Sequence, residues 1–114
     1  MARILVAEPD PDVLALVERS LAAWGHEAVR YRAGSALPDV DLMVFEPQMG
    51  ARVVGLAEVL AARTPPVELV IVSIDPSELA LHALRPVAYV LKPFSLAELE
   101  VAVAAAVGRT QHSA

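Results

Sequence analysis

The stretch LMVFEPQ, residues 42–48, joins a continuously apolar run to a carboxylate. Four consecutive apolar residues are typical of a strand buried on both faces, as in a parallel sheet that is covered by helices on either side. Similar short runs, rich in aliphatic residues, recur along the chain. The five candidate strands are Ile4–Ala7, Ala28–Tyr31, Leu42–Phe45, Leu69–Val72 and Val87–Leu91. The second of them has a mixed composition, which favours an edge position in the sheet.

Helical patterns separate these strands. Asp10 as an N-cap and Pro11 at the first helical position begin a helix that Gly25 ends. Apolar residues repeat at helical spacing over Ala51–Arg63, and Ser95–Glu98 is a capping box at the start of the last helix. The alternation of strands and helices predicts an α/β fold with a parallel sheet and helices on both of its faces.

Two segments interrupt this regular alternation. A short helix is expected to begin at Asp75 and to be closed by Pro86. The segment Arg32–Val40 lacks a helical pattern because it contains Gly34 and Pro38. The helix between the second and third strands is therefore expected to be short or missing.

Length and composition limit the classes of function. At 114 residues, 56% of them hydrophobic, the chain is long enough for one domain with its own core. It has no cysteine, which excludes disulfides, thiolate catalysis and cysteine-based zinc sites. The net charge of -5 argues against a nucleic-acid interface, and no apolar run approaches the roughly 20 residues that a membrane helix needs. No signal-peptide pattern is present, so the expected location is cytoplasmic and the expected partner is a protein.

Polar side chains follow the candidate strands where those strands end. Glu8 follows the first strand, Glu46 follows the third and Lys92 follows the fifth, while Ser73 ends the fourth. The carboxyl ends of parallel strands lie at one edge of the sheet, where ligands bind. Two carboxylates, a hydroxyl and an ammonium are therefore expected to converge at this edge.

The order of these residues resembles the receiver domain of response regulators in bacterial two-component signalling. The resemblance covers about residues 3–107 and rests on Arg3–Asp12, Asp41–Met49 and Tyr89–Phe94, of which the last segment is the most specific. Receivers carry an acidic pair after the first strand, a phosphorylated Asp at the end of the third, Ser or Thr at the end of the fourth and Lys-Pro after the fifth. The resemblance implies that the corresponding residues of this chain form one pocket.

Pattern and resemblance together predict the architecture. We expect a flavodoxin-like, doubly wound parallel sheet of five strands in the order 2-1-3-4-5. The receiver-like domain is expected over residues 1–107, and residues 108–114 are expected to be a short flexible C-terminal tail.

The resemblance implies further roles. The family carries a switch aromatic three positions before the lysine, where Tyr89 stands, and a cis peptide bond between Lys92 and Pro93. It also implies that Leu79–Leu84, with the last strand and the last helix, forms a face for protein partners. Such a partner is a kinase, another regulator or a second copy of the chain in a homodimer.

The chain departs from the family pattern where the chemistry is most demanding. A receiver needs a carboxylate nucleophile at a fixed reach and a divalent cation held by oxygen ligands. Glu46, at the phosphoacceptor position, is one methylene longer than Asp. Glu8 keeps the first acidic position, but Pro9 stands at the second and offers no side-chain oxygen. Magnesium binding is therefore expected to be lost or weak, no cofactor is expected, and the dispersed histidines predict no other metal site.

With no phosphoryl group to hold, Lys92 has a candidate partner in Glu46. We predict an ion pair between them, with an added hydrogen bond from Ser73, that holds the domain in one signalling conformation without phosphorylation. In the other interpretation, Glu46 and Lys92 are remnants without a switching role. The first interpretation describes a stand-alone atypical receiver that acts by protein–protein interaction and catalyses nothing.

Three alternative functions stay open at this level. The domain could accept phosphate in a conventional phosphorelay despite the altered pocket, although Pro9 speaks against this. It could bind a small molecule or nucleotide at the strand ends, although the chain has no glycine-rich phosphate loop. It could also be a purely structural dimerisation module, which the sequence does not separate from a signalling role.

Overall fold

The computed structural model describes residues 1–75 and 83–112 and contains a five-stranded parallel sheet. The strands are β1 (Arg3–Ala7), β2 (Glu27–Arg30), β3 (Leu42–Phe45), β4 (Glu68–Ser73) and β5 (Ala88–Leu91). Their order in the sheet is β2-β1-β3-β4-β5, so the predicted order is confirmed. The edge position predicted for the second strand is also confirmed.

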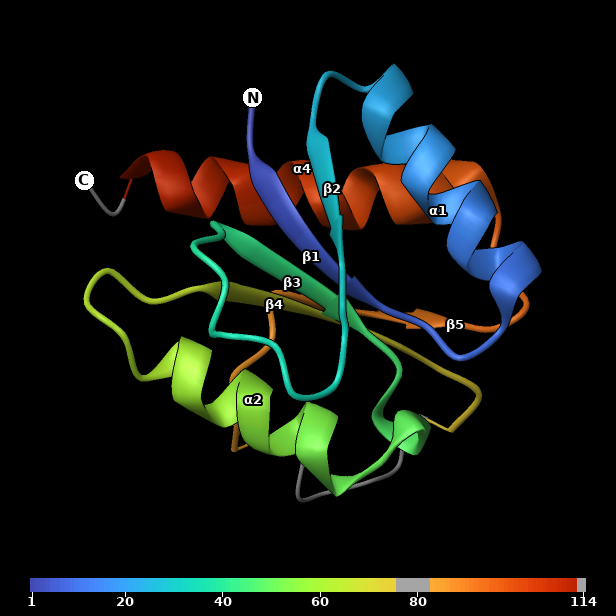
Figure 1. Ribbon diagram of the computed structural model, residues 1–114. Coiled ribbons are helices and arrows are strands. Elements are labelled where there is room, and N and C mark those ends of the chain that lie inside the picture. The colour runs from blue at the N-terminus through green and yellow to red at the C-terminus, as the bar shows by residue number, and fades with distance from the viewer. Residues whose placement is uncertain (76–82, 113–114) are drawn as a thin grey trace.

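Helices cover both faces of the sheet (Figure 1). The helical elements are α1 (Pro11–Ala23), the short 3-10 helix η1 (Pro47–Met49), α2 (Ala51–Ala61) and α4 (Leu96–His112). Helices α1 and α4 lie on one face and α2 lies on the other. None of the described helices is long and apolar enough to cross a membrane.

The central strands are buried on both sides because their alternate side chains enter two different cores. Ile4 and Val6 of β1 pack into the core under α1 and α4, whereas Leu5 and Ala7 pack into the core under α2. All four residues of β3 and all six of β4 are buried. This two-sided burial explains the continuous apolar runs in the sequence.

The first helix begins and ends as predicted. The Asp10 carboxylate accepts hydrogen bonds from the backbone N–H groups of Asp12 and Val13, at 2.9 and 3.4 Å, and Pro11 is the first helical residue. At the other end, Gly25 has a φ of +88°, a conformation that glycine adopts without steric cost. The helix therefore places Glu8 and Pro9 in a short, fixed connection between β1 and α1.

No helix joins β2 to β3, as the sequence predicted. Two arginines from other parts of the chain bind this connection instead. The Arg3 guanidinium donates a hydrogen bond to the Asp39 carbonyl at 2.8 Å, and the Arg63 guanidinium donates one to the Pro38 carbonyl at 2.9 Å. The connection is therefore attached to the body of the domain although it lacks regular structure.

Three details of the helices differ from the expectations. The last helix continues past Val107, the last residue of the expected domain, to His112, so residues 108–112 are helical. An internal glycine costs a helix only about 1 kcal/mol, and no proline follows Gly108. Helix η1 was not expected, and α2 ends two residues earlier than predicted. The helix expected between Asp75 and Pro86 falls largely on residues 76–82, which lie outside the described residues.

A histidine at the end of the α1–β2 turn accepts a hydrogen bond that its protonation would break. The Nδ1 atom of His26 accepts a hydrogen bond from the Ala2 N–H at 3.1 Å, which requires an unprotonated nitrogen. Burial, and secondly the nearby N-terminal ammonium, lower the pKa of His26 below its ordinary value of 6.5. A base with a lowered folded pKa adds stability that is present above the unfolded pKa and is lost as pH falls through the folded pKa.

We therefore predict that the free energy of unfolding falls between about pH 7.5 and about pH 5.5, and that H26N loses part of this dependence. Asparagine retains a hydrogen-bond acceptor but does not titrate. Urea unfolding at both pH values measures the effect. An identical pH dependence in the wild type and H26N would contradict it.

Candidate functional site

The candidate site lies at the carboxyl edge of the sheet. Strands β1 and β3 are neighbours, with Ala7 paired to Phe45, so Glu8 and Glu46 follow paired residues and leave the sheet side by side. Strand β4 pairs with β5 on its other side, and there Ser73 is paired with Leu91, the residue before Lys92. The fold therefore brings two carboxylates, a hydroxyl and the only lysine of the sequence to one edge, as expected.

The Lys92 ammonium contacts both glutamates. Its Nζ donates a hydrogen bond to Oε2 of Glu8 at 2.9 Å and also contacts Oε1 of the same carboxylate. Oε2 of Glu46 lies 3.5 Å from Nζ. The side chains of Glu8 and Glu46 are 5% and 4% exposed, and that of Lys92 is 18% exposed. One ammonium thus compensates two buried carboxylates, neither of which water can solvate fully.

Glu46 has a second local contact that fixes its orientation. Its Oε1 accepts a hydrogen bond from the backbone N–H of Gln48 at 3.1 Å and caps η1. Pro47 at the first position of η1 has no N–H group. The first backbone donor of η1 is therefore the Gln48 N–H, which the Glu46 carboxylate binds. Both oxygens of the Glu46 carboxylate are therefore engaged, one by the backbone and one by Lys92.

Ser73 makes contacts that the sequence did not indicate. Its Oγ accepts a hydrogen bond from the backbone N–H of Asp75 at 3.1 Å and lies 3.3 Å from the Asp75 carbonyl. It shapes the turn after β4. The added hydrogen bond expected between Ser73 and the ion pair is thus replaced by a local bond to Asp75.

The predicted contact between Glu46 and Lys92 exists, but the closer partner of Lys92 is Glu8. The sequence analysis placed Glu8 at the first position of the acidic pair and predicted no contact between it and Lys92. A signal for its role was available, because Lys92 is the only lysine and two acidic residues were already placed at the same edge. A single cation near two buried carboxylates contacts both.

Three other residues singled out in the sequence lie around this edge. Tyr89 is half-buried in β5 and packs against the α2 core, and burial raises the pKa of its hydroxyl. The Lys92–Pro93 peptide bond is cis, as the resemblance implied. Pro9 is exposed and stands directly after Glu8.

The residues present do not fit a magnesium ion. Magnesium prefers octahedral oxygen ligands and keeps several of its waters. Here an ammonium contacts both carboxylates, and Pro9 contributes no side-chain oxygen. The cavity lined by both Glu8 and Glu46 has a volume of about 10 Å³, near the lower limit for one water molecule. Within residues 1–75 and 83–112, no three His, Cys, Asp or Glu side chains gather in a metal-binding group.

Comparison with known proteins identifies the fold. By sequence, the chain matches no family model and no curated protein. By structure, it resembles a response regulator receiver protein from Burkholderia phymatum, with 20% identity, a TM-score of 0.76 and coverage of 95% of this chain and 96% of that one. It also resembles the chemotaxis response regulator CheY4 of Vibrio cholerae, with 14% identity, a TM-score of 0.76 and coverage of 93% and 98%.

A third similar structure is NtrX from Brucella abortus in complex with ADP, with 21% identity and a TM-score of 0.79. The match covers 96% of this chain but only 27% of NtrX. The chain therefore has the fold of response-regulator receiver domains, in agreement with the strand order 2-1-3-4-5.

The ion-pair geometry predicts a large effect of removing Lys92. We expect K92M to lower the free energy of unfolding by about 3 kcal/mol, because it leaves two buried carboxylates side by side without a cation. Methionine retains most of the apolar stem, so the loss reports the charge. Urea unfolding at neutral pH measures it.

The control is R30M, which breaks the exposed ion pair between Arg30 and Glu18 and should cost less than about 1 kcal/mol. Adding E8Q to K92M should restore part of the lost stability, because it removes one of the two uncompensated charges. Equal losses in K92M and R30M would show that Lys92 does not compensate the glutamates.

Proposed function

We propose that this chain is an atypical receiver domain that acts in signal transduction by protein–protein interaction, without aspartyl phosphorylation and without catalysis. One observation carries the proposal: the Lys92 ammonium lies against both buried carboxylates of the pocket. In this arrangement the pocket has its own cation. It needs no metal cofactor to hold Glu8 and Glu46 together.

The geometry also disfavours Glu46 as a nucleophile. Phosphoryl transfer depends on an accessible attacking oxygen and on cations that neutralise the charge of the transferred group. The Glu46 residue is 3% exposed, and its two oxygens contact the Gln48 N–H and the Lys92 ammonium. An incoming phosphoryl donor would have to displace both contacts and would find no side-chain oxygen at Pro9 to complete a metal site.

The ion pair also links three connections of the fold. Glu8 precedes α1, Glu46 precedes η1 and α2, and Lys92 precedes the turn into α4. Contacts among these residues favour one relative arrangement of the loops at the carboxyl edge. We infer that the domain presents one surface to its partner permanently, so that abundance or partner binding sets the signal.

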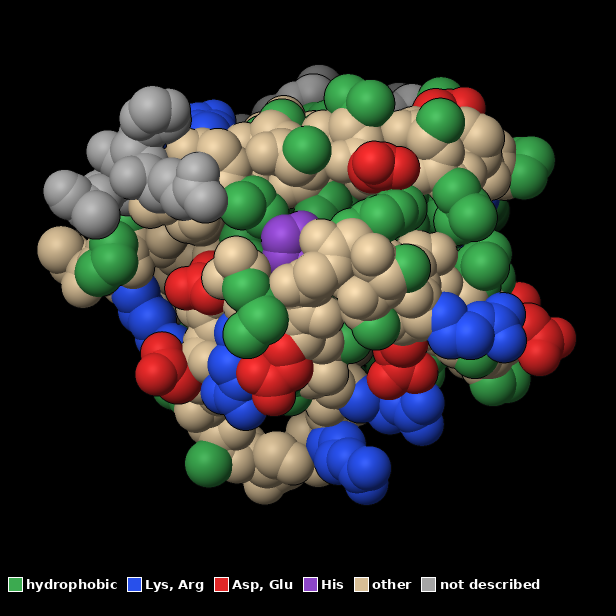
Figure 2. Space-filling model, turned by 90° about the horizontal axis from the view of Figure 1, so that it is seen from above, with side chains coloured by type: hydrophobic (Ala, Val, Ile, Leu, Met, Phe, Trp, Pro, Cys, Tyr) green, Lys and Arg blue, Asp and Glu red, His purple; other side chains and the backbone are tan. Residues whose placement is uncertain are grey.

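A protein partner is supported by apolar side chains exposed on β5 and α4. Leu91 is 48% exposed, Leu96 is 44% exposed and Val101 is 71% exposed. Figure 2, which looks onto the α1 and α4 face, shows hydrophobic side chains along both helices and in the depression between them. The partner we propose is a kinase, another regulator or a second copy of the chain. Of the segment Leu79–Leu84 expected in this face, residues 79–82 lie outside the described residues.

Incubation with acetyl phosphate and magnesium, followed by intact-mass spectrometry, tests the proposal. We expect no phosphoryl adduct on the wild-type chain. The double variant P9D/E46D restores a metal-ligand oxygen and shortens the acceptor, and it should gain the adduct. P9D and E46D alone should show little of it, because each corrects only one of the two defects.

A receiver domain that accepts phosphate, treated in parallel, confirms that the reagent is active. A stable adduct on wild-type Glu46 would overturn the proposal and would favour the conventional phosphorelay.

A further inference from the structure

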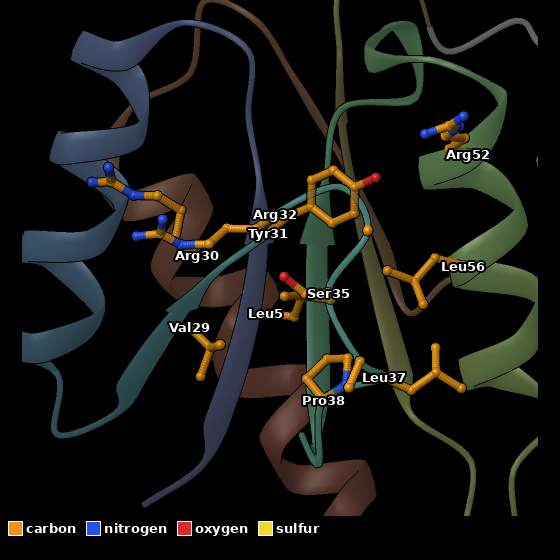
Figure 3. A pocket seen from close by; sticks show the side chains of 12 residues that line it. Leu5, Val29, Arg30, Tyr31, Arg32, Ser35, Leu37, Pro38, Arg52 and Leu56 are labelled. Atoms are coloured by element: carbon orange, nitrogen blue, oxygen red, sulfur yellow. The ribbon is translucent and has the colours of Figure 1, made fainter.

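The missing helix between β2 and β3 leaves a pocket on the α2 face of the sheet. The pocket has a volume of about 440 Å³, within the range of small-molecule sites. Its walls come from β1, the end of β2, the connection through residues 34–38, and α2. Figure 3 shows the connection passing in front of the sheet, opposite α2. The segment that replaces the helix thus closes one side of a pocket that a helix would fill.

The floor and one wall of the pocket are apolar. Leu5 of β1 is 2% exposed and forms part of the floor, and Val29 and Leu56 are half-buried beside it. Leu37 of the connection is 55% exposed although it is a large apolar side chain that lines the pocket. Burial of such side chains against an apolar ligand is favourable, because it removes apolar surface from water.

The other end of the pocket is polar and cationic. In Figure 3 the Tyr31 ring extends from the end of β2 toward α2, with its hydroxyl on the side of Arg52. The Ser35 side chain lies between β2 and α2 in the same view. Arg52 is exposed in the first turn of α2, where the positive end of the helix dipole adds to its charge. None of the ion pairs recorded within residues 1–75 and 83–112 involves Arg52.

The charge of the pocket is opposite to that of the chain. The lining includes Arg30, Arg32 and Arg52 and no Asp or Glu, although the sequence has 14 acidic and 9 basic residues. Arg30 is neutralised by Glu18 of α1 at 2.6 Å, and Figure 3 shows Arg30 and Arg32 extending toward α1. Arg52 is then the cation on the α2 side. A local excess of positive charge in an acidic protein favours an anionic ligand.

We propose that this pocket binds a small organic anion with an apolar body. The apolar body packs on Leu5, Val29 and Leu56, and the anionic group accepts hydrogen bonds from Arg52 and the Tyr31 hydroxyl. The site is separate from the pocket of Lys92, and its existence does not depend on the proposed signalling function. It adjoins the connection from Glu46 to α2, because Arg52 follows η1 by three residues.

A small molecule fits this pocket better than a protein segment does. The connection covers one side of the pocket, and the most buried lining residue, Leu5, is only 2% exposed. A partner helix would need a long open groove for its apolar residues at successive turns. The pocket instead combines a buried apolar floor with the Arg52 guanidinium and two hydroxyls.

Titration with 1-naphthoate, followed by amide chemical shifts, tests the site. We expect a saturable response that is centred on Tyr31, Ser35 and Arg52. The neutral analogue 1-naphthalenemethanol should bind about tenfold more weakly, because it cannot form charge-assisted hydrogen bonds. The cationic 1-naphthylmethylammonium should bind still more weakly. Equal binding of anion and alcohol would overturn the assignment of an anion site.

The variant R52Q should weaken naphthoate binding about three- to tenfold, the range expected for one partly exposed charged contact. Y31F removes only a hydroxyl and should weaken it less. R19Q is the matched control, since it removes the same charge from an exposed position of α1 outside the pocket. No saturable response, a response centred elsewhere, or equal effects of R52Q and R19Q would refute the proposal.

Discussion

A single ammonium group between two buried carboxylates holds together the carboxyl edge of this fold. Two carboxylates that leave neighbouring strands side by side repel each other, and burial removes the water that would screen them. Lys92 supplies the compensating charge from the far side of β4. The cap of η1 and the turns into α1 and α4 are then built around groups whose positions this contact fixes. We infer that the contacts of Lys92 specify the conformation of this edge more than they add net stability.

Much of the fold follows from local patterns with simple physical causes. Asp10 and Pro11 begin α1 because one caps free N–H groups and the other needs no such partner. The apolar runs of β1, β3 and β4 indicate burial on two faces, and this favours a parallel sheet. The end of α4 was missed because Gly108 is only a weak helix breaker. Helix η1 was missed because it depends on the Glu46 side chain, whose orientation no periodic pattern reveals.

The candidate site was predictable in its membership but not in its contacts. Strand ends predicted that Glu8, Glu46, Ser73 and Lys92 would lie near one edge, since that depends only on topology. Whether Lys92 contacts Glu8 or Glu46 more closely depends on how far its side chain extends across the end of β4. No local sequence pattern predicts this. The Ser73 hydroxyl forms a local hydrogen bond with the Asp75 backbone, and such local bonds are typical of serine in turns. The arginine-lined pocket was visible in the sequence only as an interrupted helical pattern over residues 32–40.

Titration of the wild-type chain with magnesium chloride, followed by the amide shifts of Glu8, Glu46 and Lys92, tests most directly whether Lys92 takes the place of a metal ion. The ion-pair arrangement predicts no saturable change at these residues into the tens of millimolar. P9D/E46D should respond under the same conditions. A saturable wild-type response at Glu8 and Glu46 would contradict the central claim, because it would show that the ion competes successfully with the Lys92 ammonium.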